Sequence, residues 1–484
     1  MFYNKRVSNR FIFATMAYTI PLLAAIACLY VANVDCFTNV YPKLRGIKRE
    51  YRDAGEPLFL TPLIEANKTE EAREASAVPS DVFLGVKSHS GFFTVDKTFN
   101  SNMFFWFFPA DHDYENAPVL LWLQGGPGAT SLAGLFEENG PFALTKSYNL
   151  KRNEFSWTLN HSVIYIDNPV QTGYSFTEGG FARNQTKVGQ DLYEALRQFF
   201  LVFPELRRNE FYATGESYAG KYVPAVSYAI LKNNPRADAK INLKGMAIGN
   251  GLCDPVHQLN YGGYLYEIGL IDKHGRTQFA EYERKGINYI KKKEFLKAFE
   301  IFDDLLNGDL NDGKTLFKNL TGFDYYFDYL YTNSPNELQI DFSRFVQRED
   351  IRKAIHVGSL TFNDGNAVEE NLKEDVMDSV APWISVLLSN IRVMFYNGQM
   401  DIIVPYPLTV NFLNNLPFSG SDEYKIAPRR IWRYRDDIPG YVKQAGNLTE
   451  VLVRNAGHMV PSFQPEWALD LITKFTRNQP LHRE

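Results

Sequence analysis

Residues 211–220 constrain the fold of this chain more than any other stretch. The first of them are apolar and predict a buried strand, and residues 221–231 can continue as a helix. Between strand and helix lies Ser217 among small residues, with Gly215 two positions before it. A turn this tight pushes a serine hydroxyl out over the edge of a sheet, as in a nucleophile elbow. The alternative is a purely structural turn, so the prediction depends on what the rest of the chain supplies.

Short apolar segments on both sides of this turn alternate with helix-like patterns. Residues 188–203 carry apolar side chains at helical spacing and end at Pro204. Residues 90–108 have the pattern of a β-hairpin. Further strands are expected at residues 119–123, 163–166, 245–248, 392–396 and 451–454. Buried strands that alternate with helices predict an α/β fold, with a mostly parallel central sheet and helices on both faces.

Two segments are expected to lie outside this core. Residues 35–80 are polar and interrupted by prolines, and we interpret them as a leader or propeptide segment that follows the surface in extended form. Residues 256–345 place apolar and aromatic side chains at helical spacing with few strand signals, which indicates an inserted, mainly helical cap. The core would then consist of residues 81–255 and residues 346–484.

The N-terminal residues 1–34 have the pattern of a secretory signal. Basic residues precede a long uncharged run, residues 11–34, as in the charged and apolar regions of a signal peptide. The run is also long enough to span a bilayer, so an uncleaved signal anchor is the alternative. Pro21 and the small residues before Cys28 favour cleavage. Membrane association is therefore expected only if this segment stays on the chain.

A secreted chain with only 3 cysteines in 484 residues is expected to be held by packing rather than by disulfides. Cys28 lies in the signal and Cys36 depends on the cleavage site, so Cys253 is the one certain cysteine of the mature chain. Asn-x-Ser/Thr sequons agree with glycosylation in the secretory pathway, with an extracellular or lysosomal destination. The sequons are Asn67, Asn160, Asn184, Asn319 and Asn447.

The charge of the chain excludes one class of partner. Its net charge is −5, from 51 basic and 56 acidic residues, so no basic surface for nucleic acid is predicted. No Gly-x-Gly-x-x-Gly opens a helix, and no His-x-x-x-His pair lies on one. We therefore expect neither a cofactor nor a metal.

Two later turns supply partners for Ser217. Asp401 follows the expected strand at 392–396, and His458 follows the one at 451–454. The carboxyl ends of parallel strands meet at one edge of a sheet, where open α/β sheets place their sites. The order serine, aspartate, histidine is that of α/β-hydrolases. His458 would take the serine proton, and Asp401 would orient and stabilise the imidazole.

The loop at residues 124–128 reads Gln-Gly-Gly-Pro-Gly and follows another buried strand. Glycines there let the backbone approach a substrate carbonyl, whereas the alternative is a plain tight turn. We expect the amides of Gly126 and Tyr218 to form an oxyanion hole.

Together these motifs resemble the serine carboxypeptidases over nearly the whole chain, from about residue 80 to residue 467. The matching segments are residues 121–128, 167–175, 215–220, 397–401 and 457–461. The resemblance implies an α/β-hydrolase fold with a cap, and acyl-enzyme hydrolysis of the C-terminal bond of peptides or proteins. Gln124 replaces the usual Asn of the family, which resembles the vitellogenic and vitellogenic-like branch.

The resemblance also implies how a free α-carboxylate is recognised. In the family an amide side chain, the next backbone N–H and a pair of glutamic acids make this contact. The corresponding residues here are Gln124, Gly125, Glu216 and Glu138. Because neighbouring carboxylates repel, we expect Glu216 and Glu138 to share a proton and to have raised pKa values. Carboxypeptidase activity should then be highest at acidic pH, while ester hydrolysis continues to higher pH.

Two positions depart from the usual family pattern. Ala129 stands in place of a cysteine, which removes a disulfide that many relatives have, and Gln171 replaces a glycine, so the adjoining binding loop is expected to differ.

Two alternatives keep the same fold. One is a non-catalytic secreted protein that acts by binding or as a stored precursor, but the presence of Ser217, Asp401 and His458 argues against it. The other is an acyltransferase in which an alcohol replaces water, and these residues do not distinguish the two reactions. The expected partners are peptides or proteins with a free C-terminus, and a homodimer is left open.

Overall fold

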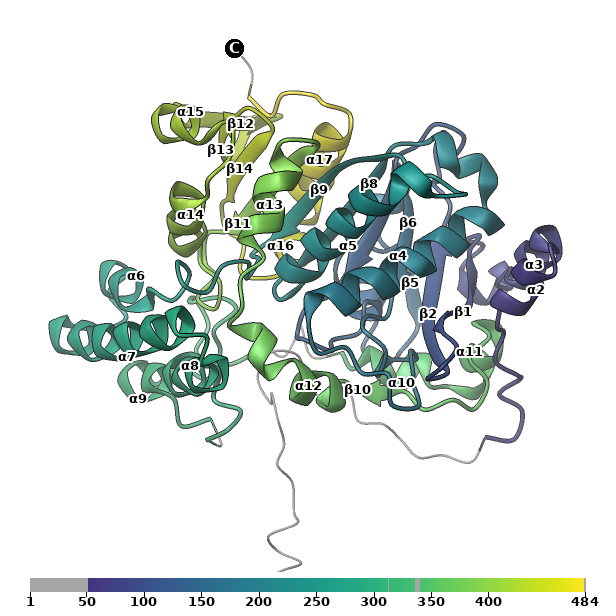
Figure 1. The fold of residues 1–484 in the computed structure, drawn as a ribbon, viewed down its shortest axis with the longest axis horizontal. Helices are drawn as coiled ribbons and strands as arrows, with labels where there is room; N and C mark the ends of the chain where they lie inside the picture. The colour runs from purple at the N-terminus through teal and green to yellow at the C-terminus, as the bar shows by residue number, and fades with distance from the viewer. Residues whose placement is uncertain (1–50, 312, 336–339, 483–484) are drawn as a thin grey trace, which may run out of the picture. The chain divides into compact units, whose positions relative to one another are not determined.

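A ten-stranded sheet forms the centre of the part of the chain that the computed structural model describes, residues 51–311, 313–335 and 340–482 (Figure 1). The strand order is β1-β2-β6-β3-β8-β9-β11-β14-β13-β12. The strands from β6 to β14 pair in parallel, and antiparallel pairs flank them on both sides. The predicted α/β fold with a mostly parallel sheet is confirmed. The predicted signal segment, residues 1–34, lies outside the described residues.

The strands of this sheet are β1 (His89–Asp96), β2 (Ser101–Phe108), β3 (Val119–Leu123), β6 (Ser162–Ile166), β8 (Phe211–Glu216), β9 (Leu243–Gly249), β11 (Arg392–Gly398), β12 (Arg430–Tyr434), β13 (Asp437–Ala445) and β14 (Leu448–Val453). Two small antiparallel pairs join β4 (Phe142–Leu144) to β5 (Leu150–Arg152) and β7 (Thr172–Gly173) to β10 (Asn363–Asp364).

The helices are α2 (Thr61–Glu65), α3 (Thr69–Ala75), α4 (Gln185–Val202), α5 (Ala219–Asn233), α6 (Tyr261–Glu267), α7 (Lys273–Lys291), α8 (Phe295–Phe302), α9 (Leu316–Thr321), α10 (Phe342–Val346), α11 (Glu349–Ala354), α12 (Asn366–Val376), α13 (Ala381–Leu388), α14 (Tyr406–Asn415), α15 (Ser421–Ile426), α16 (Val460–Phe463) and α17 (Pro465–Thr476). Gly134–Glu138 and Asp303–Asn307 are π-helical turns. None of the helices in the described ranges combines the length and the apolar character needed to cross a bilayer.

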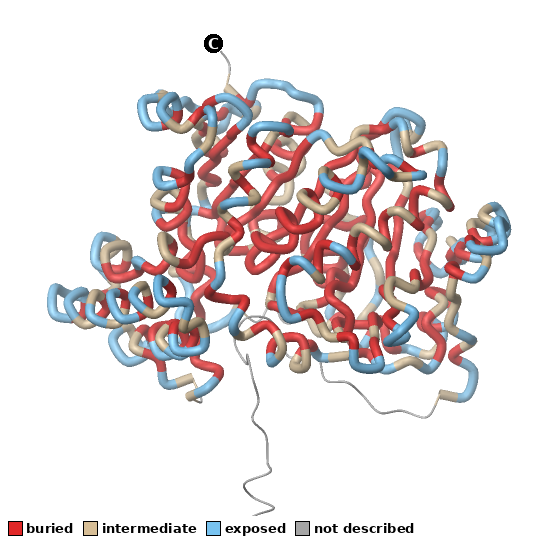
Figure 2. The backbone as a smooth tube through the Cα atoms, viewed as in Figure 1, coloured by how far each residue is buried: buried red, intermediate tan, exposed pale blue. Residues whose placement is uncertain are grey.

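Helices cover both faces of the sheet, which explains why its central strands are apolar throughout rather than alternating. Figure 1 shows α4, α5 and α13 on the viewer's side and α17 behind the sheet. On the α4 face the ring of Phe107 packs against that of Phe199, with 4.9 Å between the centroids. The backbone trace of Figure 2 accordingly shows the strands buried and the outer turns of the helices exposed.

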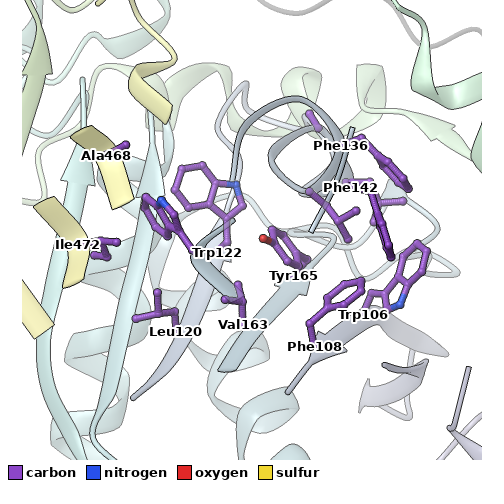
Figure 3. Close-up of a cluster of buried hydrophobic side chains, with 14 of the residues drawn as sticks. Trp106, Phe108, Leu120, Trp122, Phe136, Phe142, Val163, Tyr165, Ala468 and Ile472 are labelled. Atoms are coloured by element: carbon purple, nitrogen blue, oxygen red, sulfur yellow. The ribbon is translucent and has the colours of Figure 1, made fainter. Parts of the chain in front are cut away.

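The other face of the sheet also carries an aromatic core (Figure 3). Trp122 of β3 lies beside α17 in this view, and its ring meets that of Trp157 edge to face at 5.3 Å. Ala468 and Ile472 of α17 belong to the same buried cluster. Each such large side chain contributes about 1.5–3 kcal/mol through removal of its apolar surface from water.

The register of the parallel strands brings their carboxyl ends to one level. Glu216 at the end of β8 pairs with Gly249 at the end of β9, and Gly249 pairs with Tyr396 of β11. Gly398 at the end of β11 pairs with Val453 at the end of β14. The turns that follow these strands therefore share one edge of the sheet.

The segment before β1 differs from its predicted extended form. Residues 51–80 include α2 and α3, and Leu60 is fully buried, so this part is neither extended nor confined to the surface, while its role as a leader or propeptide stays a prediction. Leu60 N–H donates to the carbonyl of Phe92 at 3.0 Å. The segment thus covers the edge strand β1, whose unpaired backbone groups would otherwise face solvent.

The stretch that follows β9 is mainly helical, as the periodicity of residues 256–345 predicts. In the described part of this stretch the elements are α6 to α10, with no strand. Figure 1 shows α6, α7, α8 and α9 grouped together at the lower left. The boundaries drawn from the sequence for a cap, and for the core segments around it, stay predictions.

Replacing Ile472 by Ala should lower the free energy of unfolding by about 2–4 kcal/mol, because the side chain is 1% exposed and its loss leaves a cavity against the sheet. Ile426→Ala is the matched control, since Ile426 is 84% exposed and should change stability by less than about 0.5 kcal/mol. Denaturant unfolding followed by circular dichroism measures both. Equal losses in the two variants would contradict the placement of α17 in the core.

Candidate active site

The turn after β8 holds Ser217 in a strained but well-bonded conformation. Its φ of 62° is left-handed, which is unfavourable for a residue with a side chain. The N–H of Ser217 donates to Gly249 O at 3.0 Å, and its carbonyl accepts from the N–H groups of Gly220 and Leu252. Gly215 permits the close approach to Leu123, because a Cβ there would lie 2.5 Å from the Leu123 carbonyl oxygen. The predicted strand–turn–helix is confirmed.

Asp401 follows β11 and is fully buried, with donors on both carboxylate oxygens. Oδ1 accepts from the N–H of Ile403 at 3.0 Å, and Oδ2 accepts from the N–H of Val404 at 3.1 Å. Oδ2 also accepts from Asn250 Nδ2 at 2.7 Å and contacts His458 Nδ1 at 2.9 Å. These bonds fix the carboxylate and satisfy a buried charge that would otherwise be costly.

His458 follows β14 and is also fully buried. Because the Asp401 carboxylate only accepts, Nδ1 of His458 carries the hydrogen and Nε2 keeps its lone pair. Within the described residues Nε2 has no hydrogen-bond partner. The structure therefore joins His458 to Asp401, and it places Ser217 at the same edge without a hydrogen bond to the imidazole.

The glycine-rich loop after β3 packs directly against this turn. A Cβ on Gly125 would lie 2.6 Å from Tyr218 N and 2.7 Å from Ser217 Cβ, so only glycine fits at this point. Gly126 has a φ of 105°, which also requires glycine. In the described part of the chain the N–H groups of Gly126 and Tyr218 have no acceptor. Two free amides beside a serine are suited to bind a negatively charged oxygen.

Gln124 holds two buried glutamic acids together beside the serine. Its Nε2 donates to Glu138 Oε1 at 3.0 Å and to Glu216 Oε1 at 2.8 Å. Its Oε1 accepts from the indole N–H of Trp122 at 2.9 Å, which fixes the orientation of the amide. The longer side chain of Gln124 thus faces the two carboxyl groups.

Both carboxyl groups are held in their protonated form more strongly than usual. Burial raises the pKa of Glu138 to about 7, although the Gln124 and Glu216 hydrogen bonds work against this. Burial, followed by the negative charge of Glu138, raises the pKa of Glu216 well above its usual range. The expected elevation of both pKa values is confirmed, and at acidic pH the pair carries protons that it can donate.

Several residues that support the site were not singled out from the sequence. Asn250 follows β9 in a Gly-Asn-Gly turn, and besides Asp401 it bonds the N–H of Gly398 through Oδ1 at 3.0 Å. Asp167 follows β6 and accepts from Thr130 Oγ1 and from the N–H of Tyr174. Burial raises the pKa of Asp167 to about 7. In the sequence both residues follow strands of the sheet, and Asp167 also begins one of the segments that resemble the serine carboxypeptidases.

The sequon asparagines and Cys253 are the other positions singled out from the sequence. Asn67, Asn184, Asn319 and Asn447 are exposed, and Asn160 is half-buried. Cys253 is a free, buried cysteine whose thiol donates to Gly220 O at 3.1 Å. Among the described residues no His, Cys, Asp and Glu side chains are grouped to hold a metal ion.

The fold and the serine, aspartate and histidine at one sheet edge define the class of protein: an α/β-hydrolase. A crystal structure of Kex1Δp, a prohormone-processing carboxypeptidase from Saccharomyces cerevisiae, has the same fold with a TM-score of 0.72 and 23% sequence identity. The match covers 84% of this chain and 96% of that one.

Sequence comparison identifies the family: the chain belongs to the serine carboxypeptidases, whose family model matches residues 79–478. It is 56% identical to venom serine carboxypeptidase of Apis mellifera, over 93% of this chain and 97% of the relative. It is 48% identical to vitellogenic carboxypeptidase of Aedes aegypti, over 95% and 98%, and 47% identical to human probable serine carboxypeptidase CPVL, over 87% and 90%. The protein is a serine-type carboxypeptidase, as the resemblance implies.

Gly125→Ala should lower kcat/KM by about 100-fold or more, because the added methyl group pushes the loop and its amides away from the serine turn. Gly263→Ala is the control: a Cβ at this helical position meets no atom within 4 Å, so activity should stay within about twofold of wild type. Peptide hydrolysis by the purified variants, with circular dichroism for folding, measures the effect. Wild-type activity in Gly125→Ala would show that the close contact is not needed.

Proposed function

We propose that Ser217 is the nucleophile, His458 the general base and acid, and Asp401 the residue that orients the imidazole. Ser217 Oγ attacks the carbonyl carbon of the last peptide bond while His458 Nε2 takes its proton. The N–H groups of Gly126 and Tyr218 bind the oxyanion that forms, and each such donor contributes roughly 3 kcal/mol to the transition state. The single observation that carries this proposal is the buried His458–Asp401 contact, which leaves Nε2 unpartnered at the edge that holds Ser217.

The remaining steps follow from the same groups. The C–N bond breaks as His458 returns its proton to the leaving amine, and the C-terminal amino acid departs. The acyl group stays on Ser217 as an ester. Water then attacks this ester with His458 again as the base, which releases the shortened peptide and restores the serine.

We further propose that the two glutamic acids on Gln124 recognise the α-carboxylate of the substrate. The amide of Gln124 donates to Glu138 and Glu216, so it holds the pair in place, and we propose that Gln124 belongs to the carboxylate site together with them. Protonated Glu216 and Glu138 would donate O–H hydrogen bonds to the carboxylate, together with the N–H of Gly125. Recognition of this kind restricts cleavage to chain ends.

The proposal sets the direction of the pH dependence. The pKa of Glu138 is raised to about 7, so the pair is neutral at acidic pH and becomes negative as the pH rises through that value. A negative pair repels the substrate carboxylate, and carboxypeptidase activity is lost from neutral pH upward.

The cellular destination of the protein, its glycosylation and its cap are part of this proposal as well. The relatives named as venom and vitellogenic carboxypeptidases support transit through the secretory pathway, with an extracellular or lysosomal destination. The exposed sequon asparagines Asn67, Asn184, Asn319 and Asn447 are accessible positions for glycans. We also propose that residues 256–345 are a cap inserted between two parts of the hydrolase core.

Ser217→Ala should abolish hydrolysis while the protein stays folded, because no other group can form the acyl-enzyme. Mass spectrometry of a peptide library at pH 5 should show loss of single C-terminal residues with wild type only. A fluorophosphonate should label wild type and not the variant. Products cleaved internally, or products esterified rather than hydrolysed, would contradict a carboxypeptidase that uses water.

The pH profiles of two substrates separate binding of the carboxylate from the chemistry. Hydrolysis of a free-acid peptide should fall as the pH rises through about 7, the pKa of Glu138, whereas an ester or amide without a carboxylate should remain active to higher pH. Glu138→Gln should weaken binding of the acid substrate and leave the ester rate within about threefold. Glu70→Gln, at an exposed carboxyl of α3, is the control. Loss of activity toward both substrates at the same pH would falsify the role of the glutamic acids.

A further inference from the structure

The stretch Tyr325–Tyr329 comes from the helical part of the chain and lies over the turns that carry Asp401 and His458. The N–H of Ile402 donates to Tyr326 O at 3.0 Å, and the N–H of His458 donates to Phe327 O at 2.7 Å. The N–H of Tyr329 donates in turn to Met400 O at 3.0 Å. This stretch is therefore bonded to both turns that shape the imidazole site.

The side chain of Phe327 lies against the imidazole itself. The two rings are stacked, with 4.9 Å between their centroids and 19° between their planes. Phe327 is 5% exposed and His458 is fully buried. Gly457 makes the approach possible, because a Cβ there would lie 2.3 Å from the Phe327 carbonyl oxygen.

The ring of Phe327 is itself fixed by its neighbours. Tyr325 and Tyr326 meet it edge to face, with centroid distances of 5.6 Å and 5.0 Å and interplanar angles of 89° and 87°. Aromatic pairs in this geometry add packing energy beyond the area that they bury. Phe327 therefore presents a rigid face to the imidazole rather than a mobile side chain.

Orientation of His458 needs a second constraint besides Asp401. The hydrogen bond at Nδ1 fixes one nitrogen, but the ring can still tilt about that contact, and Nε2 then swings away from the serine. A flat side chain stacked on the imidazole limits this tilt. The π-face also favours the positive charge that the imidazole gains when it takes the serine proton.

We propose that Phe327 is a positioning residue for His458, which sets the plane of the imidazole and stabilises its charged form during catalysis. The proposal rests on the proposed role of His458 as general base. It makes the helical part of the chain a component of the catalytic machinery, through one ring and the backbone bonds beside it. Phe327 affects the rate of the chemical step, and this effect does not depend on which substrate is bound.

Phe327→Leu should lower kcat about three- to tenfold with KM unchanged, equally for an acid peptide and an ester, because a lost stacking contact is worth this factor. Phe327→Met also lacks the ring but fills part of its space with a flexible chain, and should show the same loss. Phe327→Tyr retains the ring and should restore most of the rate. The second-order rate of fluorophosphonate labelling, which follows only folded sites, should fall in parallel with kcat.

Phe317→Leu is the matched control: this ring is 1% exposed in α9 and packs on Phe323 rather than on His458. It should cost stability but leave the per-site rate unchanged. Wild-type rates in both Phe327→Leu and Phe327→Met would overturn the proposal, as would a change confined to KM. His458→Ala tests the role of His458 separately from that of Phe327. Full activity of His458→Ala would contradict the proposed role of His458 as general base. An inactive His458→Ala together with fully active Phe327 variants would contradict only the positioning role of Phe327.

Discussion

Parallel pairing of β8, β9, β11 and β14 is the constraint on which the rest of the site depends. The backbone hydrogen bonds of these strands bring their carboxyl ends to one level, so residues far apart in the chain follow one another across a single edge. This edge brings together Ser217, Asn250, Asp401 and His458. The burial of both sheet faces by helices makes the edge rigid, because no central strand can shift without loss of core contacts.

Close backbone contact is the second source of order. Gly125 lies against Tyr218 and Ser217 at distances that exclude any side chain, so the loop and the serine turn have one mutual position. The same loop begins with Gln124, whose amide donates hydrogen bonds to Glu138 and Glu216. The proposed oxyanion donors, the proposed nucleophile and the glutamic acid pair are thus parts of one packed unit, and a shift in one would displace the others.

The sequence predicts the framework of this site better than its supporting contacts. Ser217, Asp401 and His458 each follow an apolar strand, and strand ends meet wherever the sheet is parallel, so their shared edge follows from the pattern alone. Asn250 also follows a strand, but the direction of its amide depends on a left-handed backbone at φ 41° that no pattern reveals. Phe327 is one aromatic residue among several in its stretch, and only tertiary packing selects it for His458. The burial of Leu60 does not follow from the pattern, because the apolar run at residues 58–60 is short and lies between prolines in an otherwise polar stretch.

The buried glutamic acids also affect the stability of the folded enzyme. The folded protein holds the Glu138 proton up to a pKa of about 7, against an ordinary value of 4.5, so folding is favoured by proton uptake. This stabilisation is complete below the ordinary value and is lost as the pH rises through about 7. At neutral pH the native state therefore loses this contribution. One buried pair of carboxyl groups thereby makes the folded protease more stable in acidic than in neutral surroundings.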